Sequence, residues 1–157
     1  MRPNYRPDPA AGWASTRRAR TAHPGIRASF ARMRITKHYV AIDAANVRDE
    51  AEFWAAVFGG EIQGDDTWLE VVVDGETVVA IQDAPDHAAP EWPSDDPARQ
   101  QQQAHLDAYV EAGEVQAAEA DVISLGARLL EGHSDVTAPE GFRVYADPAG
   151  HPFCICW

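Results

Sequence analysis

Our fold prediction for this chain starts from residues 103–110, Q-A-H-L-D-A-Y-V. Polar and apolar side chains alternate along this stretch, which is typical of a β-strand with one face toward a core. The polar face carries His105, Asp107 and Tyr109, and each of these side chains can bind a metal or exchange a proton. We therefore predict that His105 is the centre of a functional site. The alternative is a row of surface residues without a function, since half-buried strands often look like this.

The elements around this strand occur in the same order in both halves of the chain. In the first half, a strand precedes a helix that is capped by Asn46 and ends at Gly59-Gly60. In the second half, a helix begins after Gly113-Glu114 and ends at Gly126. The predicted strands are residues 35–43, 61–63, 67–73 and 77–82, then 103–110, 128–131, 143–146 and 152–157.

The spacing between the halves is constant. Tyr39 precedes His105 by 66 positions, and the helix-ending Gly60 precedes Gly126 by the same number. The sequence therefore predicts an α+β fold of two βαβββ modules. Each module would have one sheet face covered by its helix and one bare face, so we expect the two to pair into a curved mixed sheet around a cleft.

Charge divides the chain into two parts. Residues 1–32 contain seven arginines and a single acid, which leaves six of the 13 basic and 24 of the 25 acidic residues for 33–157. We predict a disordered basic extension at 1–32, with Met33 as an alternative start. A nucleic-acid-binding arm or a targeting peptide is the other interpretation of the extension. The predicted domain, 33–157, consists of module one at 33–83, a Pro-rich linker at 84–100 and module two at 101–157.

The composition excludes several classes of protein. The acidic domain is expected to repel nucleic acid, and no apolar run approaches the roughly 20 residues of a transmembrane helix. Cys154 and Cys156 are two positions apart in a predicted strand, so they project to the same side and are poorly placed to bridge each other. We therefore expect a cytoplasmic protein that binds neither membranes nor nucleic acid.

Three motifs of the chain resemble those of the vicinal oxygen chelate superfamily, which includes glyoxalase I, extradiol dioxygenases and bleomycin-resistance proteins. They are F-W-A-A-V-F-G-G at 53–60, W-P-S-D-D-P-A-R-Q-Q-Q-Q-A-H-L-D at 92–107 and G-F-R-V-Y-A-D-P-A-G-H-P-F-C at 141–154. The likeness covers 33–157 and is strongest to the glyoxalase-like branch. It implies the glyoxalase/bleomycin resistance/dioxygenase fold, but it does not imply one reaction, because the superfamily includes both enzymes and plain binding proteins.

The resemblance also implies four ligand positions, one in the first and one in the last strand of each module. Carried over to this sequence, they are Tyr39, Gln82, His105 and Cys154. Tyr39 stands where His is usual, and Cys154 stands where the enzymes have Glu. His105 and Gln82 are therefore the ordinary ligands left for a divalent ion such as Zn, Ni, Fe or Mn.

The function that we predict is binding of a small organic molecule in the cleft, with a metal weakly bound or absent and with His105 as the residue for any catalysis. Asp107 is a partner for His105. One alternative is a metal-dependent lyase or isomerase of the glyoxalase type, and another is a resistance protein that sequesters a drug. Similar proteins pair their chains, so we also expect a homodimer. The predicted ligand contacts are Tyr39, Trp68, Gln82, Trp92, His105 and Cys154.

Overall fold

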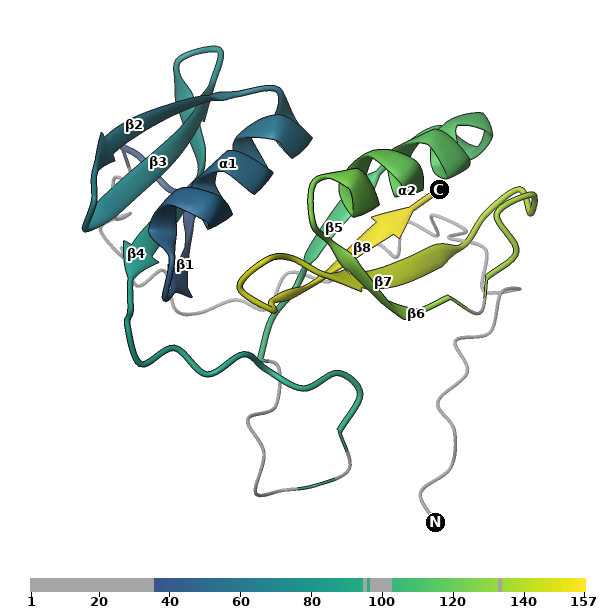
Figure 1. Cartoon of the computed structure of the whole chain (residues 1–157). Helices are drawn as coiled ribbons and strands as arrows, with labels where there is room; N and C mark the ends of the chain where they lie inside the picture. The colour runs from purple at the N-terminus through teal and green to yellow at the C-terminus, as the bar shows by residue number, and fades with distance from the viewer. Residues whose placement is uncertain (1–35, 95, 97–102, 133) are drawn as a thin grey trace, which may run out of the picture. The chain divides into compact units, whose positions relative to one another are not determined.

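Two βαβββ modules follow one another along the chain, as the repeat in the sequence predicts (Figure 1). The structure is a computed structural model that describes residues 36–94, 96, 103–132 and 134–157. The predictions for 1–32 lie outside the described residues. Module one contains β1 (Val40–Ala44), α1 (Val47–Phe58), β2 (Glu61–Asp65), β3 (Trp68–Val73) and β4 (Glu76–Asp83). Module two contains β5 (Leu106–Tyr109), the short 3-10 helix η1 (Ala112–Glu114), α2 (Val115–Ser124), β6 (Arg128–Glu131), β7 (Phe142–Ala146) and β8 (Pro152–Cys156).

Each module contains a four-stranded mixed sheet with the same topology. The strand orders are β1-β4-β3-β2 and β5-β8-β7-β6. In each sheet the first strand runs parallel to the last one, while the remaining pairs are antiparallel. This arrangement confirms the predicted fold class. It also brings residues from the two ends of each module onto neighbouring strands, where their side chains can act together.

Helix α1 is held in place at both ends and along one face. The side chain of Asn46 accepts a hydrogen bond from the backbone N–H of Asp49 at 3.3 Å, which satisfies a donor that the first turn leaves free. Gly59 ends the helix with a φ of 65°, a left-handed conformation that glycine adopts without a Cβ clash. Phe53 and Trp54 are buried on the covered face. The local sequence therefore accounts for both ends of this helix.

The larger of two hydrophobic clusters among the described residues joins the modules. The ring of Phe153 in β8 lies 5.8 Å from that of Phe53 and 5.3 Å from that of Trp54, both in edge-to-face geometry. Residues of β3 and β4 in module one and of α2 and β7 in module two belong to the same cluster. Since neither module buries this surface alone, the two stabilise each other. Within the described residues, no helix is long and apolar enough to cross a membrane.

Module two differs from the prediction at its first strand and its helix. Strand β5 begins at Leu106, so His105 lies just before it, although we predicted a strand from residue 103. The side chain of Leu106 is 36% exposed and not buried in the core, because β5 is an edge strand that pairs with β8 alone. The second predicted helix extends up to Gly126, whereas α2 ends at Ser124, and Leu125 after it is 39% exposed.

Candidate functional site

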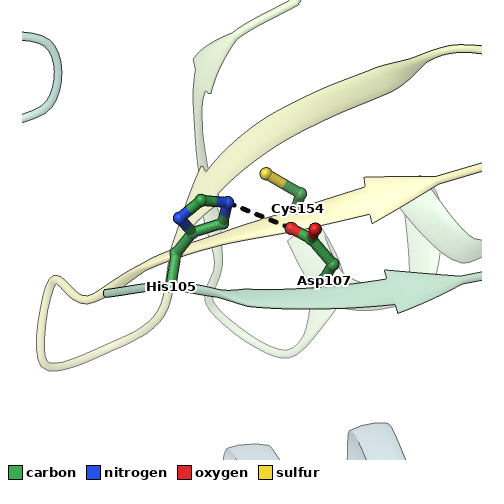
Figure 2. A group of neighbouring side chains, drawn as sticks. All are labelled: His105, Asp107 and Cys154. Atoms are coloured by element: carbon green, nitrogen blue, oxygen red, sulfur yellow. Dashed lines mark ion pairs between the residues drawn. The ribbon is translucent and has the colours of Figure 1, made fainter. Parts of the chain in front are cut away.

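The first group of candidate residues lies where β5 meets β8. His105 Nε2 is 3.1 Å from Asp107 Oδ1 (Figure 2). Asp107 lies opposite Cys154 in the parallel register of the two strands. One ligand atom from each of the three residues lies within 4.8 Å of the others. This His105/Asp107/Cys154 group therefore contains a nitrogen, an oxygen and a sulfur donor in one place.

A residue of the linker covers this group. The ring of Trp92 lies 6.0 Å from that of His105, and its Nε1 donates a hydrogen bond to Glu131 Oε2 at 3.3 Å. Trp92 also packs against the small apolar cluster that contains Cys154 and Cys156. The segment between the modules thus contributes an aromatic wall to the site. Trp92 was predicted only as a ligand contact, and its place beside His105 comes from the structure.

The donor set of the group fits a zinc-type ion. Zn²⁺ accepts imidazole, carboxylate and thiolate ligands, and a site with three protein ligands leaves one position open. Burial and, next in size, the charge of the neighbouring Asp107 carboxylate together raise the pKa of the Cys154 thiol to about 12. A metal would therefore have to displace the thiol proton, which makes binding stronger at higher pH. Both cysteines are free.

The second group of candidate residues lies on the bare face of module one. The rings of Tyr39 and Trp68 are 6.4 Å apart in edge-to-face geometry, and Trp68 lies opposite Gln82 in the antiparallel register of β3 and β4. The Lys37 ammonium lies 4.8 Å from the centre of the Tyr39 ring. The structure thus gathers the predicted contacts of module one into an aromatic and amide patch, separate along the chain from the group at His105.

A cavity of about 390 Å³ lies next to His105. It is lined by residues of β1, β4 and α1 from module one, by His87 and Pro90 of the linker, and by residues at the starts of β5 and β8. Of the six predicted contacts, His105 lines this cavity, whereas the other five lie outside its described lining. Trp54, which is not among the predicted contacts, contributes to the wall together with Phe58. The titratable residues among the lining are Asp43, His87, His105, Asp147 and His151.

Two of these histidines form a pair that the sequence did not reveal to us. The rings of His87 and His151 are 4.7 Å apart. His87 Nε2 lies 3.1 Å from the carbonyl oxygen of Ala149, and His151 Nε2 lies 2.7 Å from that of Asp43. A carbonyl oxygen only accepts hydrogen bonds, so both rings carry a proton on Nε2, and in the neutral form Nδ1 is an acceptor. The only sequence signal was the position of His151 directly after the turn that ends at Gly150.

A buried pair of carboxyl groups stands at the junction of the modules. Glu50 of α1 and Asp147, which follows β7, are 1% and 4% exposed and are hydrogen-bonded to each other. Trp54 Nε1 donates to Glu50 Oε1 at 2.7 Å and lies 3.3 Å from Asp147 Oδ2. The backbone N–H of Ala149 donates to Glu50 Oε2 at 2.8 Å, and that of His151 donates to Asp147 Oδ1 at 2.7 Å.

The environment of this pair keeps one proton in place. Burial raises the pKa of Glu50 to about 9, and both the hydrogen bond and the charge of Asp147 act in the same direction. We did not identify this pair from the sequence. A signal was nevertheless present, since Glu50 stands four positions before Trp54 and therefore shares its apolar helix face.

Comparison with known proteins places this architecture in a family. The glyoxalase-like domain family matches residues 39–156, which include both modules and both groups of candidate residues. The chain belongs to the glyoxalase-like domain family. A search of curated proteins finds no match. Membership confirms the predicted resemblance, although the reaction differs among proteins that share a fold.

Solved structures share the fold of this glyoxalase-like domain at low sequence identity. A glyoxalase/bleomycin resistance protein/dioxygenase family enzyme from Burkholderia phytofirmans is 15% identical, with a TM-score of 0.56 over 75% of this chain and 94% of that one. The fosfomycin resistance protein FosX from Listeria monocytogenes is 12% identical, with a TM-score of 0.58 over 79% and 91%. An integron cassette protein from the Halifax Harbour sewage outfall metagenome is 21% identical, with a TM-score of 0.52 over 76% and 96%. These likenesses establish the fold alone.

Proposed function

We propose that this glyoxalase-like domain binds a small organic molecule in the cavity beside His105. The observation that carries the proposal is the cavity itself, whose volume of about 390 Å³ lies within the usual range for small-molecule sites. Its walls combine the rings of Trp54 and Phe58 with a few titratable side chains. Such walls bury the apolar part of a ligand, while the polar groups fix its orientation.

His105 is the residue that we propose for orienting the ligand. Its side chain is 37% exposed, so it remains accessible from the cavity that it lines. Asp107 accepts from Nε2 and thereby holds the ring in one orientation. The ring of Trp92 lies 6.0 Å from that of His105, and the Cys154 thiol lies within 4.8 Å of a ring nitrogen of His105. Tyr39, Trp68 and Gln82 remain predicted contacts.

A ligand screen with a blocked cavity tests this proposal. Thermal shift would be measured across a library of small metabolites and antibiotics, including fosfomycin and bleomycin because relatives carry those names. Ala41 lines the cavity and Ala120 is an exposed residue of α2, so Ala41→Trp fills the cavity and Ala120→Trp is the matched control. We expect compounds that stabilise the wild type and Ala120→Trp but not Ala41→Trp. Equal stabilisation of all three proteins would refute binding in this cavity.

A metal-dependent lyase or isomerase is the second candidate function. The observation in its favour is the His105/Asp107/Cys154 group, in which three donor atoms lie within 4.8 Å. A divalent metal bound there would polarise a substrate oxygen. His105 and Cys154 would hold the ion, and Asp107 would either bind it directly or keep orienting His105. Metal analysis of the protein separates this candidate from simple ligand binding.

A further inference from the structure

The wall of the cavity contains a buried negative charge. Asp147 lines the cavity, and Glu50 lies in contact with it. Two carboxyl groups in contact give up the first proton readily and keep the second, so the pair carries one negative charge near neutral pH. Its donors are the indole of Trp54 and the backbone N–H groups of Ala149 and His151. All three are neutral, and hydrogen bonds from neutral donors compensate a buried charge only in part.

No lysine or arginine is described at this charge, and the basic side chains of the lining are the histidines His87, His105 and His151. None of the described lining residues is a lysine or an arginine. Three of the described basic residues pair with acids elsewhere, since Lys37 lies 2.8 Å from Glu70, Arg48 lies 3.6 Å from Asp66 and Arg143 lies 2.7 Å from Glu119. Within the described part of the chain, the carboxyl pair therefore has an open cavity beside it where a cation would be expected.

The other polar groups of the cavity suit a hydrogen-bond donor. His87 and His151 both direct Nε2–H at backbone carbonyl oxygens, which leaves Nδ1 of each ring as an acceptor when the ring is neutral. Asp43 adds a carboxylate to the lining. The acceptors thus outnumber the donors among the titratable groups, and a ligand that donates hydrogen bonds is favoured over one that accepts them.

The rings of Trp54 and Phe58 in the cavity wall also suit a cation. The rings of Trp54 and Phe58 are stacked 5.4 Å apart, with 20° between their planes, and both line the cavity. The face of an indole or phenyl ring attracts a positive charge, and this attraction is larger where water is excluded. The same wall also packs an apolar ligand body.

We infer that the cavity takes an organic amine, whose ammonium group lies against Asp147 and whose apolar body lies against Trp54 and Phe58. This inference rests on the proposed function, because it names the class of ligand for the same cavity. It differs from the expectation for a metal-binding substrate, which would present oxygen atoms to the His105/Asp107/Cys154 group.

Three compounds of matched size test directly which class of ligand the cavity binds. Binding of 1-naphthylmethylamine, naphthalene-1-methanol and 1-naphthoate to the wild type would be measured by calorimetry at pH 7 and 0.15 M salt. A charge-assisted contact is expected to make the amine bind at least 10-fold more tightly than the alcohol, and the carboxylate weakest of the three. The indole N–H signal of Trp54, assigned with Trp54→Phe, should shift in the nitrogen NMR spectrum when the amine binds.

The variants locate the charge that the amine recognises. Asp147→Asn should reduce the preference for the amine over the alcohol to less than about 3-fold. Asp66→Asn removes one charge from a side chain that is 94% exposed and should keep the full preference. If Asp147→Asn does not fold, the ranking in the wild type together with the Trp54 signal decides the inference.

The outcomes separate this inference from the proposed function. Equal binding of the amine and the alcohol, with the Trp54 signal shifted by both, would overturn the inference and leave the proposed function standing. Tightest binding of the carboxylate would do the same. Binding of the amine without a change at Trp54 would mean attraction to the acidic surface and would overturn the inference. If none of the three binds and the ligand screen also fails, both proposals fall.

Discussion

The two modules share one topology but differ in what their side chains do. Helix α1 buries six residues, including Phe53 and Trp54, whereas α2 buries only Val115 and Val122. The possible metal ligands show the opposite distribution, because the group of them among the described residues lies in module two. The two copies of the repeat therefore differ: α1 of module one buries more residues than α2, and module two contains the His105/Asp107/Cys154 group.

The difference in packing predicts the largest effect on stability. Trp54→Ala removes a ring that contacts Phe53, Phe58 and Phe153, so the free energy of unfolding should fall by about 3–5 kcal/mol. Val122→Ala removes two buried methyl groups from α2 and should cost less than half as much. Urea unfolding of both variants measures this. Equal losses would mean that α2 contributes as much to the core as α1 does.

The difference in chemistry predicts a selective effect on metal binding. Zinc affinity would be measured at pH 7.5 on protein purified without a chelator. His105→Ala and Cys154→Ser should each weaken it at least 10-fold, because each removes a donor of the His105/Asp107/Cys154 group. The matched control is Cys156→Ser, two positions along the same strand. A similar loss in Cys156→Ser, or no measurable binding by the wild type, would remove the metal-dependent candidate.

The Glu50–Asp147 pair lies where the modules meet, and it predicts that the free energy of unfolding depends on pH. The pKa of Glu50 is about 9 in the folded protein and near 4.5 in the unfolded chain. The unfolded state therefore loses this proton first, and the contribution of Glu50 to stability falls as the pH rises from about 4.5 to about 9. Glu50→Gln keeps a neutral side chain, so its stability relative to the wild type should be greater at pH 8 than at pH 5 by at least about 1.4 kcal/mol. Glu52→Gln, an exposed change in the same helix, should keep the pH dependence of the wild type.

Most of the fold could be predicted from the sequence because local signals and the repeat agreed. Asn46 and Gly59 mark the ends of α1 through their own backbone and side-chain chemistry. The constant spacing then predicted the second module from the first. The predicted start of β5 was wrong. Alternation reports which face of a strand a residue lies on, but it does not report where the strand begins to pair with a partner. β5 pairs with β8 only from Leu106 onward.

The His105/Asp107/Cys154 group could be predicted because its residues lie on, or directly before, the neighbouring strands β5 and β8. His105 and Asp107 follow from the alternation, and Cys154 follows from the topology of the family. The junction of the modules could not be predicted in this way, because Glu50 and Asp147 are 97 positions apart and belong to different modules. An acid in the first turn of a helix and an acid in a turn both usually face water. Tertiary packing, which the local patterns do not report, places them together.

The most direct test of the account concerns His105 and uses two measurements on one variant. In His105→Ala, urea unfolding and the affinity for the compound that stabilises the wild type most in the ligand screen would be determined together. His38→Ala is the matched control, since His38 is exposed and lies outside the described cavity lining. We predict an affinity loss of at least 10-fold with a change in unfolding free energy below about 1 kcal/mol, because His105 is 37% exposed. A loss of stability above about 2 kcal/mol with unchanged affinity would contradict the account and would assign His105 to the scaffold.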